Sequence, residues 1–431
     1  MYTGTIKQYV YQGPKARNWL IKRHSAPANC PKRDNNLRDC GHERTTNFYL
    51  VRIPESGHPK QEPENPMMVD DPALIPGIIQ HVLATPSKKR DTWIMNCRLS
   101  VIVPNRNGEK TIGLCLEALF NSDHDSFEVI VVDDCSTDNS VALIEQFPCT
   151  LVGLTEHAGA AEARNRGARQ STGALLFFID ADCLVQKETL AIAEQAAKQQ
   201  GKDVVIGGTY TCRPVDQHFF SLFQSIFIHF SELKNSLNPD YIAAHAMILS
   251  ADTFRISGGF PEDFLPIIED VEFSHRLRRR GYNLKMEPKL QVRHIFQYRS
   301  LADSMKNGFI KSKYWTIYSL GNRDLLADSG TASFALKINV LALFLILASV
   351  AIYVVVLNVI LLFGALMVLL LNAFINRELF TLFYKTGGLF FALRAAMYYM
   401  LLYPLAVGAG GLSGLAAFFF FDSSSQPGVQ S

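Results

Sequence analysis

Two carboxylates, Asp180 and Asp182, stand two positions apart where the hydrophobic run 174–179 ends. Side chains two apart in extended backbone point to the same side. Both acids are therefore expected to face a crevice at the carboxyl end of a strand, where open α/β sheets bind ligands. Like charges this close favour a cation between them, and Mg²⁺ is usually held by carboxylates together with phosphates. A solvated turn is the alternative, because one D-x-D pair is a weak signal.

Two further groups of acids could carry chemistry. Asp133 and Asp134 follow the apolar run 127–132, so a second strand end also offers carboxylates. Glu269 and Asp270 precede a helix expected from residue 271, where Asp270 is either a helix N-cap or a general base held by backbone N–H groups. His294 ends another expected strand, and a lone histidine is more often structural than a ligand.

The elements that must position these residues alternate between strands and helices. Short apolar runs at 99–103, 127–132, 151–154 and 174–179 predict buried strands. Apolar positions in 112–119 repeat with helical spacing, and a helix rich in small residues is expected at 158–170. This alternation predicts an α/β fold with a mainly parallel sheet. Neither a G-x-G-x-x-G turn nor a P-loop is present, so dinucleotide and P-loop sites are not supported.

Composition separates the chain into regions. The net charge of +2 gives no reason to expect nucleic acid, and the eight cysteines lack paired, zinc-like spacing. Residues 1–95 hold ten of the nineteen prolines and little periodicity, so we expect a mostly disordered extension. Met95 is a candidate for the original start. We expect the catalytic domain at 96–330.

The region 331–421 is expected to cross a membrane as about three helices, with 422–431 as a tail. The apolar stretch 338–375 exceeds the roughly 20 residues that one span needs, which predicts two spans meeting near Asn358. One tilted helix with an interfacial piece is the alternative. Gly410 and Gly414 have a small-x-x-x-small spacing suited to helix contact. A cytosolic catalytic domain would put the basic loop at 377–394 inside, as the positive-inside rule expects. We therefore expect an integral protein of the plasma or inner membrane.

Several motifs between residues 99 and 299 resemble, in order, those of the family 2 glycosyltransferases of GT-A fold. They are the opening strand 100–105, the turn 131–138, the runs 163–167 and 173–182, Gly258-Gly259-Phe260, and Glu269-Asp270. Cys135 stands where the family usually has glycine, and His245 stands where relatives often have asparagine. The Q-x-x-R-W motif of processive synthases is incomplete, which argues against a polymerase.

The resemblance implies a role for each candidate residue. It places Asp270 as catalytic base with Glu269 beside it, and Asp182 and His294 as ligands or contacts of Mg²⁺ or Mn²⁺ and the diphosphate. Asp180 would lie against both the ribose and the metal. The remaining donor-binding residues would be Pro104, Asn105, Asp133, Asp134 and Arg164.

The expected activity is an inverting, hexosyltransferase-type reaction. A nucleotide-diphosphate sugar would donate its sugar to the hydroxyl of a membrane-proximal, lipid-linked glycan acceptor. One alternative is a polyprenyl-phosphate sugar synthase, whose nucleophile is already anionic. Another is a non-catalytic scaffold that binds sugar nucleotides at the membrane. The aromatic stretch 219–230 is either core or a surface for lipid.

Overall fold

The computed structural model describes residues 98–296 and 298–420, together with the backbone of four strands nearer the N-terminus. The chain divides into two units, Met1–Trp93 and Ile94–Ser431. In the first, the strands form an antiparallel sheet in the order β1-β2-β3-β4. They are β1 (Gln8–Gly13), β2 (Ala16–His24), β3 (Asn47–Arg52) and β4 (Met67–Met68).

These four strands were missed by our sequence interpretation, which weighed the proline content of residues 1–95 over short runs such as Tyr49-Leu50-Val51. Runs of aromatic and β-branched residues favour strands even when their surroundings are polar. The positions between the strands lie outside the described residues, so the expectation of a mostly disordered segment stays untested there.

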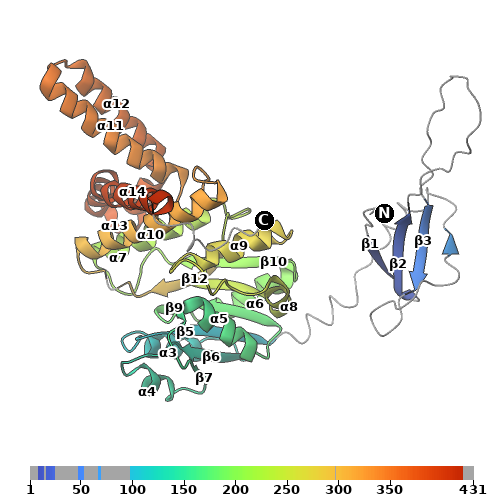
Figure 1. Ribbon diagram of the computed structural model, residues 1–431. Coiled ribbons are helices and arrows are strands. Elements are labelled where there is room, and N and C mark those ends of the chain that lie inside the picture. The colour runs from blue at the N-terminus through green and yellow to red at the C-terminus, as the bar shows by residue number, and fades with distance from the viewer. Residues whose placement is uncertain are drawn as a thin grey trace, which may run out of the picture. The chain divides into compact units, whose positions relative to one another are not determined.

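The second unit is built on one eight-stranded sheet with the order β7-β6-β5-β8-β11-β10-β12-β9 (Figure 1). Its strands are β5 (Leu99–Asn105), β6 (Phe127–Asp133), β7 (Thr150–Gly153), β8 (Leu175–Ile179), β9 (Cys183–Val185), β10 (Val204–Tyr210), β11 (Ala246–Ser250) and β12 (Asn283–His294).

The sheet is parallel from β7 to β8 and mixed beyond it. β5 pairs in parallel with β6 and β8, as the alternation of strands and helices predicted. β11 then runs antiparallel to both β8 and β10, and β9 runs antiparallel to β12. The α/β class is therefore confirmed, while the antiparallel strands were not visible in the sequence pattern because alternation reports only consecutive elements.

Helices cover the sheet and link its strands. They are α3 (Ile112–Phe120), α4 (Ser140–Ile144), α5 (Gly159–Gln170), α6 (Thr189–Gln200), α7 (Phe219–Leu233), α8 (Ala251–Ser257), α9 (Glu269–Arg279) and α10 (Leu301–Asn322). The buried face of α3 consists of Ile112, Cys115, Leu116 and Leu119, which is the predicted helical spacing.

A group of phenylalanines in the core locks the elements of the site together. Phe178 on β8 lies edge-on to Phe260, with ring centroids 5.1 Å apart. Phe260 also packs on Phe273 of α9 at 4.6 Å. All three rings are buried. This packing holds the end of β8 and the start of α9 in a constant relation, so acids on the two elements can face one another.

The C-terminal region forms helices α11 (Phe334–Val356), α12 (Ile360–Ile375) and α13 (Arg377–Met397), a π-helical turn (Tyr398–Leu402) and α14 (Tyr403–Phe420). The predicted break near Asn358 is present, because Leu357 adopts a left-handed conformation with φ 52°. In Figure 1, α11 and α12 lie side by side as a projecting hairpin. Within the described residues, 334–356 and 377–420 are long and apolar enough to cross a membrane, while α12 is shorter.

Gly410 and Gly414 on α14 are points of close helix contact, as their spacing predicted. A Cβ on Gly410 would lie 2.3 Å from the carbonyl oxygen of Phe309, and a Cβ on Gly414 would lie 2.5 Å from that of Lys313. Both carbonyls belong to α10, so only glycine permits this approach. The contact attaches the C-terminal helices to α10, which follows β12, the last strand of the eight-stranded sheet.

Candidate active site

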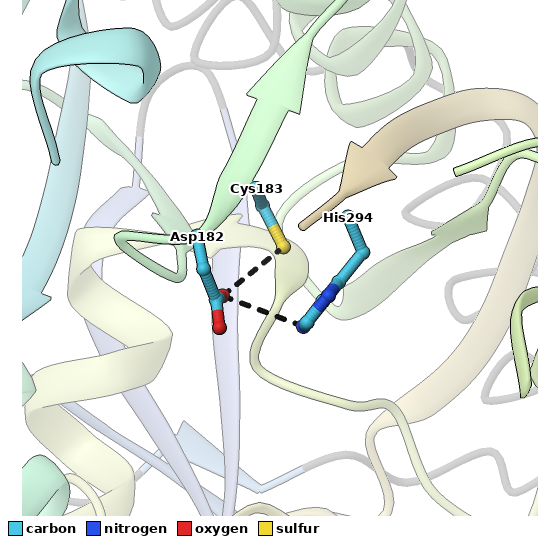
Figure 2. Close-up of side chains that lie close together, drawn as sticks. All are labelled: Asp182, Cys183 and His294. Atoms are coloured by element: carbon cyan, nitrogen blue, oxygen red, sulfur yellow. Dashed lines mark hydrogen bonds and ion pairs between the residues drawn. The ribbon is translucent and has the colours of Figure 1, made fainter. Parts of the chain in front are cut away.

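Asp182 and His294 meet because their strands pair. β9 begins at Cys183 and runs antiparallel to the end of β12, where His294 lies opposite Cys183. The Asp182 Oδ1 to His294 Nε2 distance is 3.4 Å. Figure 2 shows the two side chains turned toward each other beside Cys183. Ligand atoms of these three residues lie within 4.8 Å of one another, close enough to surround one metal ion.

The protonation states in this group suit a divalent cation held by oxygen and nitrogen. Burial and the neighbouring Asp180 raise the pKa of Asp182 to about 7, so the free carboxylate lacks a balancing positive charge. Burial lowers the pKa of His294 to about 3, which leaves the neutral imidazole that metals require. Burial also raises the pKa of the Cys183 thiol well above its usual range, so its sulfur stays protonated. Asp182 and His294 therefore fit the expected metal, and the Cys183 sulfur lies beside them.

Asp180 is paired with an arginine. The Arg164 Nη2 atom lies 2.7 Å from Asp180 Oδ1, and its Nη1 atom lies 2.5 Å from Glu269 Oε1. Arg164 is only 5% exposed. Burial opposes ionisation of Asp180, but Arg164 and nearby imidazoles hold the pKa of this carboxyl below its usual value. In the described structure Arg164 therefore faces two carboxylates, and its expected approach to the nucleotide is untested.

Both carboxylate oxygens of Asp270 are held by backbone N–H groups. Its Oδ2 accepts a hydrogen bond from the Ala244 backbone N–H at 3.1 Å, and its Oδ1 lies 2.9 Å from the N–H of Val271. The N-cap of α9 is Ile268, with φ 71°, so the alternative that Asp270 is the N-cap is wrong. Burial and the adjacent Glu269 raise the pKa of Asp270 to about 6, while Arg164 acts in the opposite direction.

A buried acid–histidine pair lies next to these groups, and the sequence analysis gave it no role. His245 Nε2 is 3.5 Å from Glu232 Oε2, and Thr209 Oγ1 donates to the same oxygen at 2.6 Å. The His245 ring stacks on Tyr210, with centroids 4.1 Å apart. Burial favours the neutral ring, but Glu232 and the site carboxylates raise the pKa of His245. No spacing in the sequence relates these residues, because they come from three different elements.

Asp133 and Asn105 shape the loop at the ends of β5 and β6. Asp133 Oδ1 accepts hydrogen bonds from Asn105 Nδ2 at 2.8 Å and Ser136 Oγ at 2.6 Å. Asn105 and Asp133 are register partners at the ends of their parallel strands. Pro104, half-buried, precedes them on β5. Asp133 thus holds the loop, and the expected contact of these three residues with the donor stays a prediction.

Asp134 is tied to the beginning of α5. Its Oδ1 accepts from the Ala158 N–H at 2.7 Å, and its Oδ2 accepts from the Gly159 N–H at 2.9 Å. The half-exposed His157 lies 2.7 Å from the same Oδ2. Asp134 is thus buried, with both oxygens already hydrogen-bonded. Its expected contact with a nucleobase stays a prediction, and His157 is a neighbour that the sequence analysis did not identify.

The comparisons with known proteins agree on a class. Residues 100–252 match the model of the Glycosyl transferase family 2. An uncharacterized glycosyltransferase of Haemophilus influenzae is 33% identical over 183 residues, covering 42% of this chain and 61% of the relative. The poly(ribitol-phosphate) beta-N-acetylglucosaminyltransferase TarS of Staphylococcus aureus is 36% identical over 116 residues, covering 25% of this chain and 20% of the relative. The chain thus spans less than two thirds of either relative.

Among solved structures, the mannosyltransferase PcManGT from Pyrobaculum calidifontis, in complex with GDP-Man and Mn²⁺, is 19% identical. The match covers 76% of this chain and 92% of that chain, with a TM-score of 0.46. The curled, mixed α/β sheet and the family match together identify the GT-A fold that we expected.

Proposed function

We propose, on the premise that residues 100–252 form a glycosyl transferase family 2 domain, that the chain is an inverting hexosyltransferase. The donor would be a nucleotide-diphosphate sugar, and the acceptor would be the hydroxyl of a membrane-proximal glycan carried on a lipid. The S. aureus relative is named as an N-acetylglucosaminyltransferase that acts on poly(ribitol-phosphate), which supports sugar transfer to a hydroxyl acceptor.

The observation that carries this proposal is the burial of the Asp270 carboxylate and its hydrogen bond from the Ala244 N–H. A general base works best when its pKa is near the operating pH, and burial together with Glu269 raises the pKa of Asp270 to about 6. The Ala244 N–H fixes one carboxylate oxygen and so orients the other. Asp270 would remove the proton from the acceptor hydroxyl as that oxygen attacks the anomeric carbon. A single displacement of this kind inverts the anomeric centre.

The other residues would bind and position the reactants. Asp182 and His294 would hold Mg²⁺ or Mn²⁺, which when bound neutralises charge on the departing diphosphate. Arg164 would fix Asp180 on the donor side and Glu269 beside the base. The loop held by Asp133 and Asn105 would border the nucleotide pocket together with Pro104 and Asp134.

A membrane location is supported by two apolar segments, 334–356 and 377–420. Contact of the second segment with α10 through Gly410 and Gly414 would hold the catalytic sheet near the bilayer. With the catalytic unit on the cytosolic side, sugar nucleotides made in the cytosol would have direct access to it.

Replacing Asp270 with Asn tests the proposal and separates it from the alternatives. We expect kcat for a hydroxyl acceptor to fall by about 10²–10⁴-fold, while donor affinity measured by calorimetry changes little. Asp263→Asn, at an exposed position in the same segment, is the matched control and should retain full activity. A polyprenyl-phosphate synthase would keep much of its rate, because its nucleophile needs no base. A scaffold would show no transfer even in the unmodified protein.

A further inference from the structure

A large apolar cavity lies between the catalytic domain and the C-terminal helices. Its volume is about 580 Å³, within the range of about 300–1,000 Å³ typical of ligand pockets. Helices α7, α10, α11 and α14 form its walls. The surface of the cavity is almost entirely apolar, with Trp315, Phe344 and Leu412 among the residues that line it. Such a lining selects a hydrocarbon chain and not a sugar.

The cavity opens onto the apolar outer surface of the membrane candidates. Leu341 and Phe344 on α11 line it and are 59% and 42% exposed. Leu412 on α14 lines it too and is 63% exposed. Both helices belong to segments long and apolar enough to cross a bilayer. A chain lying in the bilayer could therefore enter the cavity from the side without crossing water.

Two lysines, Lys311 and Lys337, line the cavity, and only one of them has a hydrogen-bond partner in the described residues. Lys337 Nζ donates to the Ala327 carbonyl. Lys311 on α10 faces the cavity, and its ammonium makes no hydrogen bond or ion pair within residues 98–296 and 298–420. Lys311 is exposed in this lining, and its charge interacts at longer range with the carboxylates of Asp270, Glu232, Asp180 and Asp182. An ammonium without a direct partner beside an apolar cavity is suited to bind a negatively charged head group.

The end of the cavity near Lys311 is close to the proposed base. Tyr241 packs against the cavity residue Trp315, with ring centroids 5.5 Å apart, and its hydroxyl is 3.4 Å from Oγ1 of Thr331 in the same lining. Three residues further on, the Ala244 N–H donates to Asp270. The charge of Lys311 also interacts electrostatically with Asp270, so a head group bound at Lys311 lies on the side of the cavity that faces the proposed base.

We infer that this cavity binds the hydrocarbon chain of the acceptor lipid and that Lys311 binds the phosphate of its head group. The inference rests on the proposed function and names its acceptor class, an isoprenoid or acyl chain that carries phosphate. The phosphate at Lys311 would orient the acceptor group toward Asp270 while the chain stays in the cavity and the adjoining bilayer.

Two variants test the cavity and the cation separately. Gly411 lines the cavity, and a Cβ there meets only Ser312 and Thr316 hydroxyl oxygens at 3.7 Å, so Gly411→Leu fills space without a backbone clash. Gly364→Leu is the matched control, because nothing lies within 4 Å of its Cβ and it is not part of the lining. Lys311→Gln removes the cation, and Lys306→Gln removes one from an exposed position of the same helix.

The probe is a polyprenyl phosphate with a photoreactive group in its chain, added to the full chain in detergent micelles. We expect crosslinks on Leu341, Phe344 and Leu412, and labelling about tenfold weaker in Gly411→Leu and Lys311→Gln than in either control. The matching polyprenol without phosphate should label weakly. Inorganic phosphate should not compete, because it lacks the chain.

Equal labelling in Gly411→Leu and the unmodified protein, or crosslinks confined to the outer face of α12, would overturn the inference. Donor binding and transfer are measured on the same samples, so the two proposals fail separately. Efficient transfer to a water-soluble glycan, at a rate that neither Gly411→Leu nor Lys311→Gln changes, would refute the lipid site and leave the proposed transferase activity intact. Specific labelling without any transfer would refute the transferase and leave the lipid site standing.

Discussion

Arg164 Nη1 and Glu269 Oε1 lie 2.5 Å apart and join α5 to the first turn of α9 across 105 positions of sequence. Because the other end of the same guanidinium is on Asp180, one side chain connects the strand-end acid to the acids of α9. The pair also explains the asymmetry between neighbours. Glu269 forms an ion pair with Arg164, whereas Asp270 makes no ion pair in the described part of the chain. Burial and the neighbouring Glu269 raise the pKa of Asp270 to about 6.

Replacing Arg164 with Met should destabilise the fold strongly. Removing one partner of a buried ion pair leaves uncompensated charge and costs about 3–5 kcal/mol. Arg166→Met is the control on the same helix, since its pair with Glu162 is 46% exposed on the arginine side and is worth about 0–1 kcal/mol. Thermal unfolding of the full chain in detergent should therefore show a much larger fall in Tm for Arg164→Met. Adding Glu269→Gln should recover part of the loss, and additive losses would contradict the coupling.

The pH dependence of kcat should report Asp270. A base must be ionised to act, and its pKa is raised to about 6. The rate should therefore be low when pH is below about 6 and level off above it. Glu269→Gln should move this acid limb to lower pH, because Glu269 raises the pKa of Asp270 and also occupies Arg164. Glu145→Gln, an exposed change far along the sequence, should leave the limb in place. An acid limb unmoved by Glu269→Gln would exclude Asp270 as its source.

Donor binding should depend on a divalent cation held by Asp182. Asp182→Ala removes the carboxylate nearest His294, so calorimetric binding of the sugar nucleotide with Mn²⁺ should disappear. Asp252→Ala, whose carboxylate is 68% exposed on α8, should bind normally. The pKa of Asp182, raised to about 7 in the metal-free protein, should also make metal affinity fall as pH drops below that value. Tight donor binding in EDTA equal to that with Mn²⁺ would refute this assignment.

A chain that begins at Met95 should transfer sugar at nearly the full rate. The eight-stranded sheet and every candidate site residue lie after that position, and the strands of the first unit form a separate sheet. The measurement is kcat and KM of the shortened protein in membranes, beside the full chain. A large loss of kcat in the correctly folded shortened protein would show that the first unit contributes to the site.

Local pattern alone determined much of this molecule. The apolar runs and their helical or extended spacing predicted the parallel strands β5 to β8, the buried face of α3 and the break beside Asn358. These features follow from interactions between residues close in sequence and from the side that each element buries. The same runs end in Asp134 and Asp180, so the edge of the sheet that carries carboxylates was predictable as well.

Tertiary structure decided which of those side chains meet. His294 reaches Asp182 only because β12 pairs with β9, and Arg164 reaches Glu269 only because α5 and α9 come together around Phe260. The cavity beside Lys311 depends on α14 packing closely on α10. Such contacts join residues 100 or more positions apart, and their energies depend on burial, which periodicity does not report. Most of the acids could therefore be identified from the sequence, whereas the residue that each acid contacts is known only from the tertiary structure.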